Sequence, residues 1–237
     1  MRDPHGAVGL QANGVSHSFG AQEVLANVGV DLRAGELTAL IGPNGAGKST
    51  LLRILQGQLQ PSQGQVRFQG NPIATCRHQV TLMPQRGRID WNFPITALEM
   101  VRLHGSTQAG AGAIPPGDAL AAVGLKECAA ARLSDLSGGQ QQRILLAGAI
   151  SAGRSTLLLD EPCSAMDPPT RSLVLELLLQ LRNSGISICL TSHDWGRALL
   201  SYDRVIVLDR TVLFDGAPTG IDQALDDLMA SRHRCNH

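Results

Sequence analysis

The chain has 237 residues, of which 43% are hydrophobic and 17% charged, a composition that supports a packed core and excludes a wholly disordered chain. Lys plus Arg equals Asp plus Glu, at 20 each, and this zero net charge argues against a nucleic-acid-binding protein. The five cysteines form no C-x-x-C pair, so they indicate neither a disulfide framework nor a zinc finger. No apolar run reaches the ~18 residues of a transmembrane helix. Residues 1–6 lack the apolar core of a secretory signal, so we expect a cytosolic chain.

The first part of the chain predicts strands and then a helix. Runs rich in Val and Leu predict strands over Val8–Phe19 and Val24–Leu32. The compact apolar run Leu37–Ile41 is typical of a buried strand. A helix is expected over Lys48–Leu55, with Gly57 as its stop signal.

The middle of the chain is predicted to be helical and the last part to return to strands. Thr96 and Glu99 have the spacing of a capping box. Gly105–Gly117 holds mostly Gly, Ala and Pro and is expected to be a loop, whereas a second helix is expected from Ser137 to about Ile150. The remaining predictions are strands over Thr156–Asp160, Ile186–Thr191 and Val205–Leu208, and a helix from Pro168 to near Gly185.

The order of these elements predicts the fold class. Strands that alternate with helices imply a parallel sheet covered on both faces. The helical residues of about 90–150 look like an insertion into that sheet. We therefore expect an α/β protein with a helical lobe, in which residues 1–237 form one domain.

A glycine-rich segment between the third strand and the first helix matches G-x-x-x-x-G-K-[ST]. Its residues are Gly42, Pro43, Asn44, Gly45, Ala46, Gly47, Lys48 and Ser49. Glycines let backbone N–H groups point at a phosphate, and the following helix adds the positive end of its dipole. Lys48 would neutralise the β- and γ-phosphates, and the Ser49 hydroxyl would hold Mg²⁺.

An apolar strand that ends in two acids provides a second part of a nucleotide site. The run Thr156–Leu159 is followed by Asp160 and Glu161. The first acid is placed to reach the metal of a phosphate loop, directly or through water. Glu161 would orient or deprotonate a water that attacks in line with the γ-phosphorus.

A second helix start is also directed at an anion. In Leu136–Gln140, Ser137 is a suitable N-cap, and the free N–H groups behind it form an anion site. One chain then has two phosphate-directed helix ends, whereas one nucleotide needs only the first.

These motifs, in this order, resemble those of the ATP-binding cassette (ABC) family over nearly the whole chain. The matching positions are the phosphate loop Gly42–Thr50, the Q-loop glutamine Gln85, the signature Leu136–Gln140, the Walker B strand Leu157–Glu161, the D-loop Ser164–Asp167 and the switch histidine His193. The resemblance implies a P-loop NTPase core with a mainly parallel sheet, an N-terminal antiparallel β subdomain and an inserted helical subdomain. It also implies ATP and Mg²⁺ as cofactors, with Gln85 as a further Mg²⁺ ligand and Phe19 stacked on the adenine.

In this family two cassettes pair head to tail when they bind ATP, which explains the two helix ends. The signature residues Ser137, Gly138, Gly139 and Gln140 would close on the ATP of the partner copy, and His193 would contact the γ-phosphate of its own copy. Met166 replaces the usual D-loop leucine, and Gly148 and Gly153 stand where the family usually has other residues. No catalytic position is lost, so we expect active hydrolysis.

The segment Arg86–Val101 is expected to couple the cassette to a partner. Trp91 and Phe93 lie close together beside arginines, as is typical of interfaces, although both rings packing inside the lobe is the alternative. This segment looks like that of the ATP subunits of bacterial zinc and manganese importers. The resemblance implies a polytopic membrane permease, a solute-binding protein and a location at the inner face of the cell membrane.

Three alternatives stay open from the sequence. The cargo is expected to be zinc, then manganese, but nothing in the ATP site excludes an iron chelate, haem or an exported molecule. A soluble, non-transport ABC ATPase is disfavoured because the chain has no long coiled coil, no second cassette and no basic excess. His233, Cys235 and His237 are potential metal ligands, but a frayed terminus over about residues 231–237 is the favoured interpretation.

Overall fold

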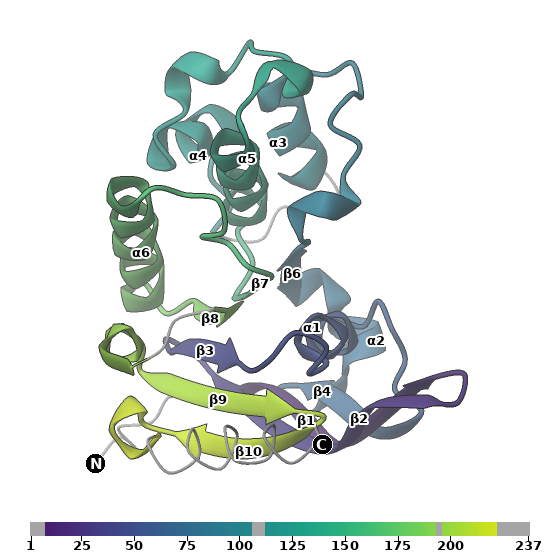
Figure 1. Ribbon diagram of the computed structural model, residues 1–237. Helices are drawn as coiled ribbons and strands as arrows, with labels where there is room; N and C mark the ends of the chain where they lie inside the picture. The colour runs from purple at the N-terminus through teal and green to yellow at the C-terminus, as the bar shows by residue number, and fades with distance from the viewer. Residues whose placement is uncertain (1–7, 106–111, 193–195, 222–237) are drawn as a thin grey trace, which may run out of the picture.

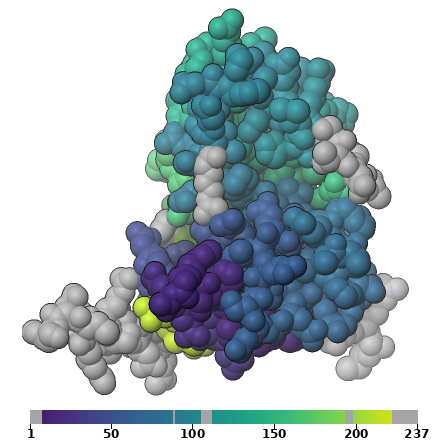
Figure 2. Space-filling model, turned by 90° about the vertical axis from the view of Figure 1, so that its right-hand side faces the viewer, coloured from purple at the N-terminus to yellow at the C-terminus, as the bar shows by residue number. Residues whose placement is uncertain are grey.

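The computed structural model describes residues 8–105, 112–192 and 196–221. Two sheets form the lower body of the molecule, and a group of helices stands above them (Figure 1). In the space-filling view this helical lobe, in teal and green, rises over the purple and blue body (Figure 2). Within the described ranges no helix is both long and apolar enough to span a membrane.

The two sheets differ in strand direction. The four-stranded sheet has the order β2-β1-β4-β5, and its pairs are antiparallel. Its strands are β1 (Val8–Phe19), β2 (Gln22–Arg33), β4 (Gln63–Phe68) and β5 (Asn71–Pro72). The six-stranded sheet has the order β10-β9-β3-β8-β7-β6 and is parallel except for the β9–β10 pair. Its strands are β3 (Leu37–Ile41), β6 (Val80–Met83), β7 (Thr156–Leu159), β8 (Ser187–Thr191), β9 (Arg204–Asp209) and β10 (Thr211–Gly216).

Side chains of the parallel sheet alternate between two hydrophobic cores. In β7, Leu157 and Leu159 face the core shared with the helical lobe, whereas Leu158 faces the core shared with the antiparallel sheet. Successive side chains of a strand point to opposite faces, so the three buried leucines of β7 contribute to both cores. Helix α1 (Lys48–Leu55) supplies Leu51, Leu52, Ile54 and Leu55 to the second core and so lies between the two sheets.

The helical lobe is inserted between strands β6 and β7, which are neighbours in the sheet. It contains α3 (Ala97–Gly105), α4 (Pro116–Ala122) and α5 (Gly138–Ser151), whereas α6 (Pro168–Asn183) follows β7. The capping box before α3 is present, since Thr96 N–H donates to Glu99 Oε2 at 2.8 Å and Glu99 N–H donates to Thr96 Oγ1 at 3.3 Å. The hydrogen bonds to Thr96 lower the pKa of Glu99.

Most predicted elements are confirmed, with bounds that differ by one or two residues. The loop expected over Gly105–Gly117 is wrong at both ends, because α3 includes Gly105 and α4 begins at Pro116, which suits a first helical turn. Strands β4, β5, β6 and β10 and the short helix α2 (Ile73–Cys76) were not expected. Gly148, an unusual residue for a helix interior, lets α3 approach α5, because a Cβ there would lie 3.0 Å from the Cβ of His104.

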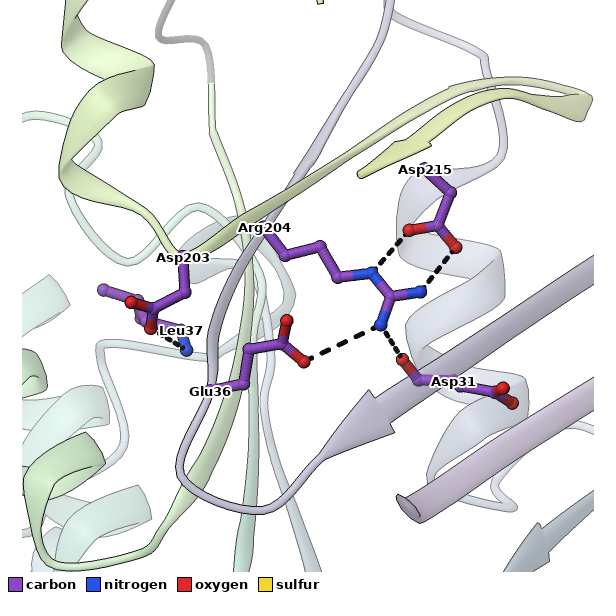
Figure 3. A network of polar contacts seen from close by, with 6 residues as sticks. All are labelled: Asp31, Glu36, Leu37, Asp203, Arg204 and Asp215. Atoms are coloured by element: carbon purple, nitrogen blue, oxygen red, sulfur yellow. Dashed lines mark hydrogen bonds and ion pairs between the residues drawn. The ribbon is translucent and has the colours of Figure 1, made fainter. Parts of the chain in front are cut away.

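A polar network ties the two sheets together at the end of the parallel strands remote from the phosphate loop (Figure 3). Arg204 at the start of β9 contacts both carboxylate oxygens of Asp215 and donates to the Asp31 carbonyl at 2.8 Å. Its guanidinium also lies 3.7 Å from Glu36 Oε2. Burial is the main cause of a raised pKa at Glu36, and Arg204 acts in the opposite direction. One guanidinium therefore contacts a carbonyl oxygen of β2 and the carboxylates of the turn before β3 and of β10.

Replacing Arg204 by Met is expected to lower the free energy of unfolding by about 2–3 kcal/mol, because it leaves two carboxylates without their cation. Arg67, which is half-buried and makes hydrogen bonds but no ion pair within the described residues, provides the control Arg67→Met, with an expected change below about 0.5 kcal/mol. Urea unfolding of both variants measures the difference, and equal stabilities would contradict the role given to Arg204.

Candidate functional site

The predicted phosphate loop lies between β3 and α1, and two of its glycines are required by close contacts. Gly42 has φ +151, and a Cβ there would lie 2.0 Å from the Leu208 carbonyl oxygen. Gly47 has φ +95, and its Cβ would lie 2.6 Å from Leu25 Cδ2 in β2. At Gly45, with φ +84, a Cβ would meet nothing within 4 Å. The two ends of the loop therefore pack closely against β9 and β2, whereas its middle, at Gly45, is uncrowded.

Lys48 closes this loop from its first helical turn. Its side chain is 8% exposed, and Nζ donates to the carbonyl oxygens of Gly42 at 2.7 Å and Pro43 at 2.9 Å. A buried ammonium held at the mouth of a glycine loop supplies a positive charge beside the N-terminus of α1. This arrangement suits a polyphosphate.

The two acids after β7 are held by one hydroxyl from the neighbouring strand. Thr191 Oγ1 donates to Asp160 Oδ1 at 2.9 Å and accepts the backbone N–H of Glu161 at 2.7 Å. Asp160 is 5% exposed. Thr191 therefore fixes both acids at the end of the sheet where the phosphate loop also begins.

The backbone of Glu161 is held in a strained conformation. Its φ is +52, a left-handed value that costs a non-glycine residue about 1–2 kcal/mol. Gln142 in α5 is fully buried, and its Nε2 donates to the Glu161 carbonyl at 2.6 Å. Strained residues held on both sides by their surroundings are frequent at functional sites.

Sequence reasoning did not assign roles to Thr191 and Gln142. The available signal for Thr191 was its position at the carboxyl end of a strand, because the ends of parallel strands meet at one edge. The contact of Gln142 with Glu161 joins two elements far apart in the chain, and no spacing indicates it.

The other predicted nucleotide residues lie in separate elements. Phe19 ends β1, is 50% exposed and makes a T-shaped ring contact with His17, with 4.7 Å between ring centroids. Its hairpin is adjacent to the phosphate loop through the contact of Gly47 with Leu25. Gln85 follows β6 and precedes the short 3-10 turn Arg86–Arg88. His193 lies outside the described residues.

The signature forms the capped start of α5, and its serine acts as predicted. Ser137 Oγ accepts the backbone N–H of Gln140 at 3.3 Å, and Gln140 Oε1 accepts that of Ser137 at 2.8 Å. The glutamine half of this capping box was not expected. Gly139 permits a close approach of the D-loop, since its Cβ would lie 3.0 Å from the Ala165 carbonyl oxygen.

A hollow of about 400 Å³ opens in front of this helix start. Its lining includes Ser137, Gly138, Gly139 and Gln140 from the signature, Arg86 and Arg143, and the D-loop with Asp167. A hydrogen bond from the side chain of Thr170 is the main cause of a lowered pKa at Asp167. The hollow therefore combines free helix N–H groups with two guanidinium groups and one carboxylate.

A smaller cavity of about 160 Å³ adjoins Glu161, with Cys163 and Tyr202 in its lining. Burial raises the pKa of the Cys163 thiol and of the Tyr202 hydroxyl, so both side chains are neutral at physiological pH. Nowhere in the described ranges, this cavity included, do three His, Cys, Asp or Glu side chains have the arrangement of a metal site. His233, Cys235 and His237 lie outside those ranges.

Comparison with known proteins identifies the family. The family model described as ABC transporter matches residues 25–164 of this chain. The chain belongs to the ABC transporter family. As an ABC cassette it binds ATP and is an ATPase, and its α/β fold class is confirmed.

Relatives and solved structures of ABC proteins cover most of the chain. It is 34% identical to the manganese transport system ATP-binding protein MntA of Synechocystis sp., over 87% of this chain and 84% of that protein. It is 35% identical to the zinc transport system ATP-binding protein TroB of Treponema pallidum, over 89% and 82%. An ATP-binding subunit of an ABC transporter matches with a TM-score of 0.80 and 26% identity, over 94% and 98% of the two chains. A dimeric bacterial ABC cassette matches with a TM-score of 0.78 and 26% identity, over 88% and 98%.

The donor set of this ABC cassette fits a magnesium ion. Mg²⁺ prefers oxygen ligands, and Ser49, Gln85 and Asp160 offer a hydroxyl, an amide carbonyl and a carboxylate. Asp160 Oδ1 accepts a hydrogen bond from Thr191, and no described residue donates to its Oδ2.

Proposed function

We propose that this chain is the ATP-hydrolysing subunit of an ABC importer for a metal ion, and that it acts on a membrane permease at the inner face of the cell membrane. Two phosphate-directed helix starts on one chain, at Lys48 and at Ser137, carry the proposal, because a pair of copies would use both. The metal cargo rests on relatives at 33–35% identity that are named as manganese or zinc transport ATP-binding proteins. One ABC ATPase domain over residues 1–237 stays a prediction.

Each catalytic part is assigned to the residue at the matching family motif, and the surroundings of Lys48, Asp160 and Glu161 support their roles. Lys48 and the loop N–H groups would bind the β- and γ-phosphates, with Phe19 on the adenine. Glu161 would orient the attacking water and accept its proton. Gln85 and His193 would act at the γ-phosphate. Bound Mg²⁺ would neutralise charge on the phosphates, held by Ser49, Asp160 and Gln85.

Two copies would close on two ATP molecules. The signature of each copy, from Ser137 to Gln140, would contact the γ-phosphate held by Lys48 of the other copy. The capped start of α5 supports this role, because Gly138 and Gly139 in its first turn line the hollow.

The permease is proposed to dock on Arg86–Val101, and here the structure separates the two aromatic residues. Trp91 is partly buried against the main core, and its Nε1 donates to the Arg86 carbonyl at 3.1 Å. Phe93 is 55% exposed. Phe93 therefore suits a contact with the permease, whereas Trp91 stabilises the segment by packing on the core and bonding to the Arg86 carbonyl.

Replacing Phe93 by Ser is expected to weaken permease binding by about tenfold or more, because exposed aromatics at interfaces contribute more than their share of affinity. Basal ATPase activity and unfolding free energy should stay unchanged. Leu200→Ser, at a residue 60% exposed on another element, is the matched control. Binding of the purified chain to its permease in detergent measures the effect, and a normal affinity for the Phe93 variant would refute the docking role.

The cargo is tested with the complete transporter. ATPase activity of this chain, reconstituted with its permease, is measured with the solute-binding protein loaded with zinc, loaded with manganese, or empty. The metal that gives the largest stimulation identifies the substrate, and zinc is the expected one. Equal stimulation by all three forms would contradict metal import.

A further inference from the structure

Arg86, the residue directly after the Q-loop glutamine, lies over the first turn of the signature helix. Its Nη1 donates to Gln141 Oε1 at 3.1 Å. A Cβ on Gly138 would lie 2.5 Å from the same Nη1 and 3.2 Å from Cζ. The guanidinium therefore occupies the space that any side chain at Gly138 would fill.

The charge of Arg86 is unexpected at this position. The N-terminus of a helix is its positive end, so a cation there is disfavoured and an anion is favoured. A guanidinium has five N–H donors, and in the part of the chain that the structure describes the Arg86 guanidinium has one hydrogen-bond acceptor, Gln141. An anion in front of the helix would remove this conflict.

The hollow in front of α5 has the composition that such an anion needs. Arg86 and Arg143 both line it, next to the signature. Its one acid, Asp167, already accepts a hydrogen bond from the side chain of Thr170. The Arg143 guanidinium already donates to the carbonyl oxygens of Val123 and Gly124, at 3.1 and 3.4 Å. Arg86 is therefore the cation of the hollow that retains more unused donors.

We propose that Arg86 contributes its guanidinium to the γ-phosphate of the ATP bound by the partner copy, as an additional phosphate-binding residue beside the signature. This role rests on the proposed pairing of two copies. The Arg86 backbone is well placed for it, because its carbonyl oxygen accepts hydrogen bonds from Trp91 Nε1 at 3.1 Å and from the Ile89 N–H at 3.2 Å. These contacts hold the residue at the edge of the hollow before any nucleotide arrives.

The test measures ATP-driven dimerisation in the Glu161→Gln background, where hydrolysis does not consume the ligand. Arg86→Gln removes the charge but keeps an amide able to reach Gln141, and Arg86→Lys keeps a charge. Sedimentation velocity over a range of ATP concentrations is expected to show a dimer weakened by at least about tenfold for the Gln variant, as for loss of a charged hydrogen bond. The Lys variant should lose less. ATP affinity of the isolated copy, measured below the dimerisation range, should change by less than about twofold.

Two further variants separate this proposal from the pairing itself. Ser137→Asp keeps a good N-cap but places a negative charge at the signature, so it should abolish the dimer. Arg102→Gln, on the exposed face of α3, should dimerise normally. If Ser137→Asp blocks dimerisation and Arg86→Gln does not, the Arg86 proposal is wrong and the pairing stands. If Ser137→Asp dimerises normally, the pairing fails and Arg86 has no partner phosphate. If the isolated Arg86→Gln variant loses affinity for ATP, Arg86 acts on the nucleotide bound by its own copy. That result would also overturn the proposal.

Discussion

Replacing Glu161 by Gln is expected to slow ATP hydrolysis by about 10²–10⁴-fold, the usual contribution of a positioned general base. The amide keeps the size of the side chain, and the hydrogen bonds that Thr191 and Gln142 make to this residue involve its backbone, so the local structure should persist. ATP binding should also persist, and two copies should remain closed on uncleaved ATP.

The measurement for this variant is phosphate release together with the dimer fraction in the presence of ATP. Glu176, exposed on α6, provides the matched control Glu176→Gln, which should hydrolyse ATP at the normal rate. An unchanged rate in Glu161→Gln would remove Glu161 from its role as the base.

Replacing Lys48 by Ala is expected to weaken ATP binding by about 10²–10³-fold, since it removes a buried charge from the phosphate loop. The variant also loses the two hydrogen bonds from Nζ to the carbonyls of Gly42 and Pro43, so the loop should close less firmly. Hydrolysis should be lost with binding.

The chain offers a direct control for this variant, because it has only two lysines, Lys48 and Lys126. Lys126 is exposed in the helical lobe, and Lys126→Ala should bind ATP normally. Titration with a fluorescent ATP analogue compares the two variants, and melting temperatures verify that both are folded. Normal affinity in Lys48→Ala would contradict the phosphate-loop assignment.

Sequence patterns predicted the elements that have a clear apolar pattern or a clear helix start in their own residues. Strands β3 and β7 are buried at every position and, apart from Thr38 and Thr156, apolar. Helix α1 follows the glycine-rich loop, and α5 follows the Ser137 cap. Strand β4, with the sequence QGQVRF, has only two buried side chains, and its pairing with β1 decides its conformation. Helix α4 begins at Pro116 in a stretch whose Gly and Pro content favours a loop, yet burial of Ala119 and Leu120 stabilises it. Such tertiary contacts are invisible to local propensity.

In the candidate site, too, residues in short motifs were predicted, whereas residues that act through tertiary contacts were not. Lys48, Asp160, Glu161 and Ser137 were found because each belongs to a short motif with a fixed spacing. Thr191 and Gln142 were not, since their roles come from contacts between distant elements. The position of Arg86 over Gly138 likewise depends on how the turn after β6 packs on α5.

The most direct test of the account is the crystal structure of the Glu161→Gln variant with bound ATP and Mg²⁺. We predict a two-fold dimer in which each γ-phosphate lies between Lys48 of one copy and Ser137 of the other. A dimer, or a monomer, in which the signature of an ATP-loaded copy faces bulk solvent would contradict it.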